Sequence, residues 1–195
     1  MPHLIVIAGP NGAGKSTVAP KLLQGVLRVN EFVNADAIAQ GLSAFAPETV
    51  AIQAGRIMLK RLQQLASQRD NFAFETTLAS RSFAPWIANL CQIDYAFYLI
   101  FLWLPNPEFA IARVQERIRQ GGHSVPEETI RRRYEAGIKN FFELYRPLAG
   151  SWFFYDNSNT ADPRLIAAGE KRGNINVVNA QIWQQIEENY YGKST

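Results

Sequence analysis

The most constraining feature of this 195-residue sequence is the stretch IAGPNGAGKSTVA at residues 7–19. It matches the pattern G-x-x-x-x-G-K-[ST] at Gly9, Gly14, Lys15 and Ser16. In such a loop the glycines let the backbone turn tightly, so that successive N–H groups point at phosphate oxygens. The positive end of the following helix adds to that attraction. We therefore predict a phosphate-binding loop, which requires a strand before it and a helix after it.

Both flanks of the loop have the required character. Residues 4–8, LIVIA, form a short apolar run typical of a buried parallel strand, and residues 15–26 predict a helix. Pro20 lies inside that helix and removes a backbone donor, so we expect a kink or a loosened turn there. Within the loop, Lys15 is expected to reach the β- and γ-phosphates of ATP, and the Ser16 hydroxyl to bind Mg²⁺. Before nucleotide binds we expect Lys15 to face solvent. The residues assigned to nucleotide binding are Gly9, Pro10, Asn11, Gly12, Ala13, Gly14, Lys15, Ser16 and Thr17.

Strand-like and helix-like segments alternate along the rest of the chain. Apolar runs occur at 31–35, 71–75, 96–104, 152–156 and 175–179, and residues 47–68 have apolar side chains at helical spacing. This alternation predicts an α/β fold, a P-loop NTPase three-layer sandwich with a mostly parallel sheet and helices on both faces. We expect a single domain over residues 1–195. A last helix near 180–191 should place Ile182, Trp183 and Ile186 against the core.

Composition restricts the function classes. A hydrophobic share of 47% and a charged share of 19% are ordinary for a globular domain. The net charge of +3 fits a protein that binds anionic ligands, but it gives weak support to nucleic-acid binding. Cys91 is the only cysteine, which excludes an internal disulfide and favours a cytoplasmic location. No apolar run reaches transmembrane length, so no membrane association is expected.

The segment 106–142 differs from the alternating pattern because it is rich in arginine. Gly121-Gly122 and Pro126 divide it, which predicts two helices joined by a mobile turn, with Ser124 or Thr129 capping the second helix. One interpretation is a solvated basic face. The other is a lid that closes arginines onto the γ-phosphate, excludes water and stabilises the transferring charge. The arginines are Arg113, Arg117, Arg119, Arg131, Arg132 and Arg133.

Two carboxylates end predicted strands. Asp36 follows the second apolar run and Glu75 ends the third. In an open α/β sheet, ligands bind beyond the carboxyl ends of the strands. One carboxylate could take the proton of an acceptor hydroxyl, and the other could hold the water shell of Mg²⁺. The alternative for Asp36 is a helix N-cap. We assign Asp36 and Lys15 to catalysis, Ser16 and Glu75 to the metal, and Asp36, Glu75, Thr76 and Arg81 to the substrate.

These motifs together resemble the zeta-toxin family of P-loop kinases, especially its short bacterial members. The matching pieces are GPNGAGKST (9–17), VNADAIA (33–39), FETTLAS (74–80) and the block at 112–141. Members of that family transfer the γ-phosphate of ATP to a hydroxyl of UDP-N-acetylglucosamine and are held inactive by a small antitoxin. The resemblance implies the same class of reaction here, with Asp36 as the base and Arg117 and Arg133 as lid arginines. The loop YDNS (155–158), with Asn157, looks like the adenine-contacting loop of related kinases; an ordinary Asx turn is the alternative.

Two other functions remain open from the sequence. A P-loop ATPase would hydrolyse ATP without an acceptor, and a nucleotide-gated module would bind RNA. The LSGGQ-like signature and the Asp-Glu strand end of transporter-type ATPases are absent, and the arginines gather in one segment rather than over an open face with aromatics. These patterns favour a kinase acting on a small hydroxyl-bearing metabolite, without nucleic acid as partner.

Overall fold

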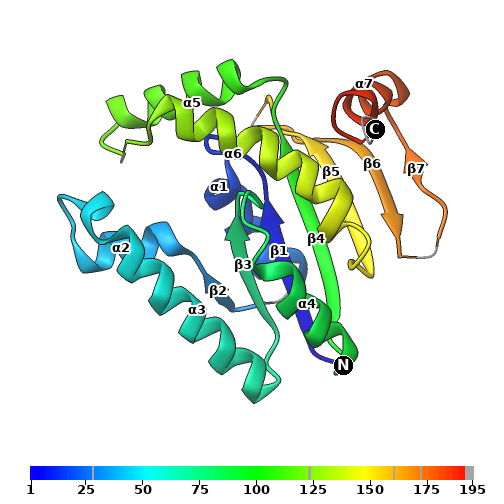
Figure 1. The fold of residues 1–195 in the computed structure, drawn as a ribbon, viewed down its shortest axis with the longest axis horizontal. Coiled ribbons are helices and arrows are strands. Elements are labelled where there is room, and N and C mark those ends of the chain that lie inside the picture. The colour runs from blue at the N-terminus through cyan, green and yellow to red at the C-terminus, as the bar shows by residue number, and fades with distance from the viewer. Residues whose placement is uncertain (28, 123, 160, 172, 192–195) are drawn as a thin grey trace.

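The computed structural model describes residues 1–27, 29–122, 124–159, 161–171 and 173–191. Within them, one seven-stranded sheet has the order β2-β3-β1-β4-β5-β6-β7 (Figure 1). The strands are β1 (His3–Ala8), β2 (Glu31–Val33), β3 (Phe72–Thr76), β4 (Ala96–Trp103), β5 (Ser151–Asp156), β6 (Arg164–Glu170) and β7 (Asn176–Val177).

The first five strands are parallel and the last two are antiparallel to their neighbours. The mostly parallel sheet predicted from the sequence is therefore confirmed. β6 was not predicted, because RLIAAGE lacks the run of β-branched and aromatic residues that marks a strand. The apolar run at 175–179 supplies only the two exposed residues of β7.

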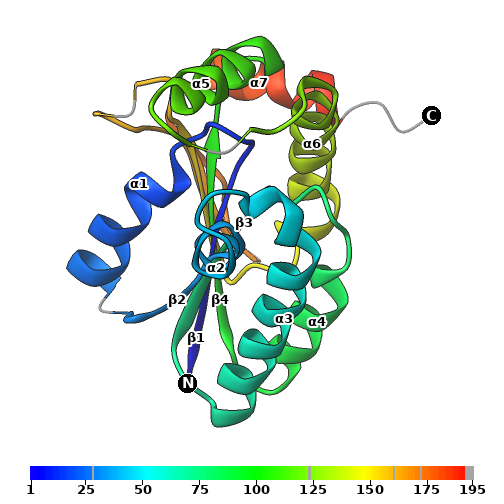
Figure 2. The same ribbon diagram turned by 90° about the vertical axis from the view of Figure 1, so that its left-hand side faces the viewer.

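Helices cover both faces of the sheet, as predicted. Figure 2 shows α1 (Lys15–Pro20) on one face and α3 (Ala51–Gln68), α4 (Phe83–Gln92) and α6 (Glu127–Asn140) on the other. α5 (Pro107–Arg119) lies over the carboxyl ends of the strands. The expected loosening at Pro20 is also present, because the chain continues from it as a π-helix, Lys21–Leu27. The remaining segments are α2 (Ala35–Leu42), a 3₁₀ turn (Pro47–Val50), a π-helical segment (Phe141–Tyr145) and α7 (Ala180–Tyr190).

The core lies between the sheet and the helices on its two faces. β1 is buried along Leu4–Ala8, as the apolar run predicts. α7 packs its predicted face inward: Trp183 and Ile186 are buried, and the Trp183 ring stacks on Trp152 with centroids 5.6 Å apart. Ile57, one of the apolar side chains at helical spacing within residues 47–68, is not part of the core, since it is 39% exposed.

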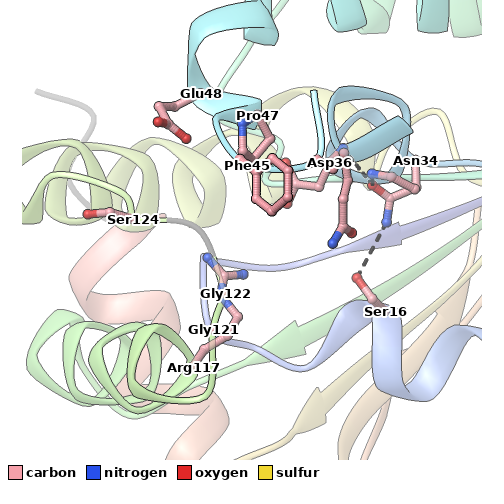
Figure 3. Close-up of a pocket in the computed structure, with 13 residues that line it drawn as sticks. Ser16, Asn34, Asp36, Phe45, Pro47, Glu48, Arg117, Gly121, Gly122 and Ser124 are labelled. Atoms are coloured by element: carbon pink, nitrogen blue, oxygen red, sulfur yellow. Dashed lines mark hydrogen bonds between the residues drawn. The ribbon is translucent and has the colours of Figure 1, made fainter. Parts of the chain in front are cut away.

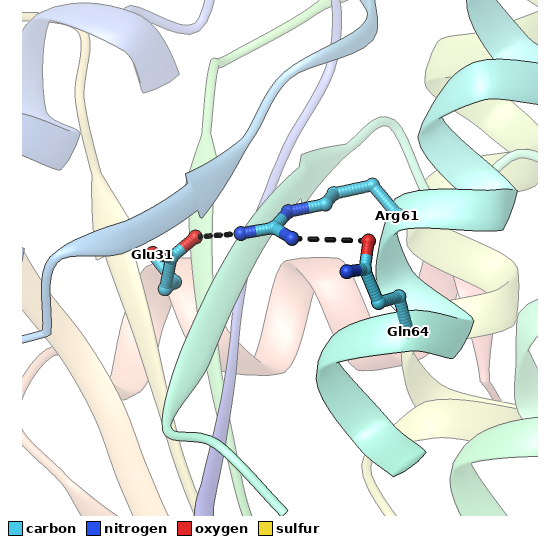
Figure 4. A network of polar contacts seen from close by, with 3 residues as sticks. All are labelled: Glu31, Arg61 and Gln64. Atoms are coloured by element: carbon cyan, nitrogen blue, oxygen red, sulfur yellow. Dashed lines mark hydrogen bonds and ion pairs between the residues drawn. The ribbon is translucent and has the colours of Figure 1, made fainter. Parts of the chain in front are cut away.

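The edge strand β2 is tied to the helix beside it. Arg61 of α3 donates to the Glu31 carboxylate at 2.7 Å and to the Gln64 side chain at 3.1 Å (Figure 4). This bridge fixes the start of β2, whose carboxyl end leads directly to α2. Among the described residues, no helix is long and apolar enough to cross a membrane.

Candidate active site

The phosphate-binding loop follows β1, the strand at which the strand order of the sheet reverses. β1 has β3 on one side and β4 on the other, so the connections leaving these strands run to opposite sides of the sheet. Such a switch point leaves a crevice at the carboxyl ends of the strands. Gly14 adopts φ 76°, a left-handed conformation that favours glycine, and caps α1. At Gly12 a Cβ would come within 2.8 Å of the Ala110 carbonyl oxygen, so the loop and α5 need a glycine there to approach closely.

Lys15 is buried, which corrects the expectation that it faces solvent. Its Nζ donates to the carbonyl oxygens of Gly9 and Pro10 at 2.9 and 3.0 Å. Burial lowers the pKa of the Lys15 ammonium, while Glu75 and Asp36 oppose that shift. The loop therefore holds its lysine through its own backbone at the place where phosphates would bind.

Ser16 and Glu75, the two residues predicted to bind a metal ion, contact each other. The Ser16 hydroxyl donates to Glu75 Oε2 at 2.9 Å, and Asn34 Nδ2 donates to Ser16 Oγ at 3.4 Å. Burial raises the pKa of the Glu75 carboxyl, and Lys15 and Ser16 oppose that rise. A hydroxyl beside a carboxylate offers the hard oxygen ligands that Mg²⁺ takes together with phosphates and waters, so these residues fit the ion. In the described part of the chain, no group of three or more His, Cys, Asp or Glu forms an all-protein metal site.

Asp36 lies in the first turn of α2 but does not cap it. The cap is Asn34, whose Oδ1 accepts from the backbone N–H groups of Asp36 and Ala37 at 2.7 and 3.1 Å. The alternative of Asp36 as an N-cap is therefore wrong. Sequence reasoning missed Asn34, although Asn before an apolar helical run is a known cap signal.

Four neighbouring cavities meet at Asp36. The loop cavity, about 370 Å³, is lined by the phosphate-binding loop, Glu75 and Arg117. The outer cavity, about 510 Å³, lies between α2 and the Gly121-Gly122 turn. The lid cavity, about 350 Å³, includes Arg132 and Arg133. The inner cavity, about 240 Å³, is lined by Asn11, Lys15, Asp36, Glu75, Thr76 and Arg133 among others.

The two helices predicted within 106–142 are α5 and α6, and they bring arginines to these cavities from one side. Arg117 lines the loop and outer cavities, and Arg133 lines the lid and inner cavities. Figure 3 shows Arg117 and the glycine turn facing Asp36 and Asn34 across the outer cavity, with Ser16 nearby. Neither Ser124 nor Thr129 caps α6; the cap position is Pro126, without a side-chain bond. His123, within the predicted turn, lies outside the described residues.

The other assigned residues divide into two groups. Asn11, Gly12, Gly14 and Thr17 line the loop cavity, whereas Gly9, Pro10 and Ala13 are buried and form the loop's backbone. Arg81 is exposed and lines none of the four cavities.

The loop containing Asn157 is fastened to the phosphate-binding loop. The Asn157 side chain is fully buried and donates to the Ala13 carbonyl at 2.6 Å. This bond suits support of the loop better than direct contact with a base. The Asx turn is present at the preceding residue, since Asp156 Oδ1 accepts from Ser158 N. Arg113, one of the arginines of the predicted lid segment, instead donates to the carbonyls of Asn157 and Ser158 at 2.8 and 2.6 Å.

A family model described as "AAA domain" matches residues 4–137. The chain belongs to this AAA-domain family. The match covers β1, the phosphate-binding loop, both carboxylates Asp36 and Glu75, and most of α6. An uncharacterized protein of Haemophilus influenzae is 27% identical over 130 residues, covering 67% of this chain and 91% of that protein.

Solved structures share the fold at low sequence identity. The AvrRxo1-ORF1:AvrRxo1-ORF2 complex with sulphate ions matches with a TM-score of 0.77 and 16% identity, over 95% of this chain. This chain spans only 63% of the matched AvrRxo1 chain. The PezAT toxin–antitoxin system of Streptococcus pneumoniae matches with a TM-score of 0.64 and 15% identity, over 100% of this chain and 80% of that one. A protein of Chloroflexus aurantiacus described as a candidate kinase has a TM-score of 0.53 and 20% identity, over 67% of this chain and 75% of that one. The fold is thus that of P-loop kinase-like proteins.

Proposed function

We propose that this protein is an ATP-dependent phosphotransferase that moves the γ-phosphate to a hydroxyl of a small metabolite. The observation that carries the proposal is the position of Asp36, which lines the loop cavity and also the three cavities around it. A base that faces both the nucleotide side and open space beyond it suits proton removal from an acceptor hydroxyl.

In this mechanism the chain's residues divide the work. Lys15 and the loop N–H groups hold the β- and γ-phosphates, and Arg117 and Arg133 stabilise the charge that develops on the transferring group. Ser16 and Glu75 would hold Mg²⁺, which would neutralise phosphate charge. Asp36 accepts the proton of the attacking hydroxyl. The outer and lid cavities, about 510 and 350 Å³, give space for an acceptor.

The finer proposal is an acceptor of the UDP-N-acetylglucosamine type and regulation by a small antitoxin protein. It rests on the resemblance of the motifs to zeta toxins, and the likeness to the PezAT toxin–antitoxin system supports it. Asn11 to Thr17 and the Asn157 loop would bind or support the nucleotide. Substrate contacts by Thr76 and Arg81 belong to the same proposal, although exposed Arg81 would need the acceptor to extend beyond the cavities.

Hydrolysis of ATP without an acceptor is the second candidate. It is favoured by one observation, the carboxylate of Glu75 next to Ser16 and Lys15, where it could orient a water molecule. The two functions differ in where the phosphate goes.

The test is ATP turnover with and without a panel of nucleotide sugars, followed by mass analysis of every acceptor. The kinase proposal predicts ADP formation that increases with one acceptor and a product heavier by one phosphoryl group. Brisk release of inorganic phosphate that no acceptor changes would favour the ATPase instead.

A further inference from the structure

Asn11, the third residue of the phosphate-binding loop, has an unusual environment. Its side chain is 8% exposed and makes no hydrogen bond with any residue in the described part of the chain, and its Oδ1 is enclosed without a partner. Burying an amide in this way destabilises a folded chain unless something else bonds to it. The side chain is therefore a candidate contact for a ligand.

The location of Asn11 indicates which part of a bound ligand its side chain would contact. Both the loop cavity and the inner cavity are lined by Asn11, Lys15, Asp36 and Glu75. The loop cavity adjoins the α1 N-terminus, where phosphates would bind, and the inner cavity extends toward Thr76 and Arg133. Asn11 thus lies at the junction through which a transferring group would pass, and it is the uncharged member of the four.

A neutral amide suits this junction chemically. A phosphoryl group presents only acceptor oxygens, whereas a substrate bearing hydroxyl or N–H groups also presents donors. An amide has a donor and an acceptor, so a side chain lining both cavities can bond to both. A carboxylate would repel the phosphoryl group, and an alkyl side chain would offer it nothing.

We propose that Asn11 is a further catalytic residue, with Nδ2 donating to an oxygen of the γ-phosphoryl group. Oδ1 then accepts from a donor group of the acceptor other than the reacting hydroxyl. This inference rests on the proposed function. In the step, the hydroxyl oxygen bonds to the γ-phosphorus while the bond from that phosphorus to the β–γ bridging oxygen breaks. Its electron pair leaves with ADP, the hydroxyl proton passes to Asp36, and Asn11 gains or loses no proton.

The test compares a triphosphate with a diphosphate, because only the triphosphate carries the γ-phosphoryl group. Calorimetric titrations with Mg²⁺–ADP and with the non-hydrolysable Mg²⁺–AMPPNP are made on the parent, on Asn11→Ala and on Asn11→Ser. We expect Asn11→Ala to weaken AMPPNP binding about tenfold or more, the usual effect of losing a hydrogen bond to a charged group, while ADP affinity changes less than about twofold. Asn11→Ser retains a donor, so its affinity for AMPPNP should fall less than that of Asn11→Ala. It replaces Asn11→Ala in the test if that variant does not fold.

Asn157→Ala is the matched control. Asn157 is also a buried amide that contacts the same loop, but it lines none of the four cavities. Loss of the Asn157 side chain should weaken the binding of ADP and of AMPPNP to the same extent. The inference is wrong if Asn11→Ala leaves both affinities unchanged, if it weakens both alike, or if the parent itself does not bind AMPPNP. Failure of the proposed function would show differently, as a parent that binds AMPPNP through Asn11 but phosphorylates no acceptor.

Discussion

Lys15 must exchange its partners when a nucleotide binds. Its ammonium group is held by the Gly9 and Pro10 carbonyls, in an environment that lowers its pKa. Phosphates entering the loop would replace these neutral acceptors with charged ones, which form stronger hydrogen bonds. Part of the cost of burying the lysine in the nucleotide-free chain would thereby be offset on binding.

Replacing Lys15 with alanine should therefore affect binding much more than folding. The affinity for Mg²⁺–ATP should fall by at least about tenfold, since a hydrogen bond to a charged group is lost together with its charge. Calorimetric titration measures this loss, and the thermal unfolding midpoint serves as the control. An unchanged affinity would mean that the loop does not bind the phosphates of ATP.

Glu75 should leave a signature in the pH dependence of stability. Its pKa is raised above the usual 4.5, so the folded chain binds this proton more tightly than the unfolded chain does. The contribution of Glu75 to the free energy of unfolding is then largest below pH 4.5 and is lost as pH rises through the raised pKa. Urea unfolding at a series of pH values across that range should show that the free energy of unfolding of the parent declines as pH rises. This decline should be absent in Glu75→Gln. Parallel curves for the two proteins would contradict the buried, shifted carboxyl.

At the scale of elements, α5 and α6 are each held by contacts that lie away from the Gly121-Gly122 turn between them. Gly12 packs against α5, and Arg113 binds the 157–158 carbonyls. Near the end of α6, Asn140 Nδ2 donates to the Leu78 carbonyl at 2.7 Å. Closure of the predicted lid would therefore have to keep these contacts of α5 and α6 in place, rather than move both helices as a body.

Arg117→Ala tests the lid interpretation against a solvated basic face. Charge on the transferring phosphoryl group is greatest in the transition state, so turnover should fall by about 10²-fold or more while nucleotide affinity changes little. Arg119→Ala is the control on the same helix, because Arg119 is exposed, pairs with Glu116 at 3.3 Å and lines none of the four cavities. Equal, small effects of both changes would support the solvated face.

The contact of α6 with the segment after β3 depends on a glycine. A Cβ at Gly137 would clash with the Thr77 carbonyl oxygen, two residues after Glu75. We expect Gly137→Ala to cost about 1–3 kcal/mol of unfolding free energy, the range for overpacking. Gly55→Ala, in α3 where a Cβ meets nothing within 4 Å, should instead stabilise by up to about 1 kcal/mol. Denaturant titration compares the two; a stable Gly137→Ala would show that the helix can shift without cost.

At the scale of the whole molecule, the sequence predicted the architecture where one local pattern decided it. The glycine–lysine motif required strand, loop and helix, and LIVIA and Pro20 behaved as their chemistry predicts. β6 was missed because its strand character comes from pairing with β5, a long-range contact that RLIAAGE does not encode locally.

The candidate site was predictable to the extent that it depends on strand ends. Asp36 and Glu75 were found because parallel strands bring their carboxyl ends to one edge. The burial of Lys15, the isolation of the Asn11 amide and the bond from Asn157 to Ala13 were not predictable, because each depends on how separate loops pack. Arg81, assigned to the substrate from the sequence, lies outside the four cavities, so its contact with a substrate stays a prediction.

The central claim is that Asp36 takes the proton of an acceptor hydroxyl, and Asp36→Asn tests it most directly. Two rates are measured on one preparation: ADP release without acceptor, and phosphorylated product with the acceptor found in the panel. The amide keeps the shape but cannot take the proton, so transfer should fall by about 10²–10⁴-fold while hydrolysis by water need not follow. Asp94→Asn, in the turn before β4, should change neither rate. Transfer as fast as in the parent, or hydrolysis that depends on Asp36 without any phosphorylated acceptor, would contradict the account.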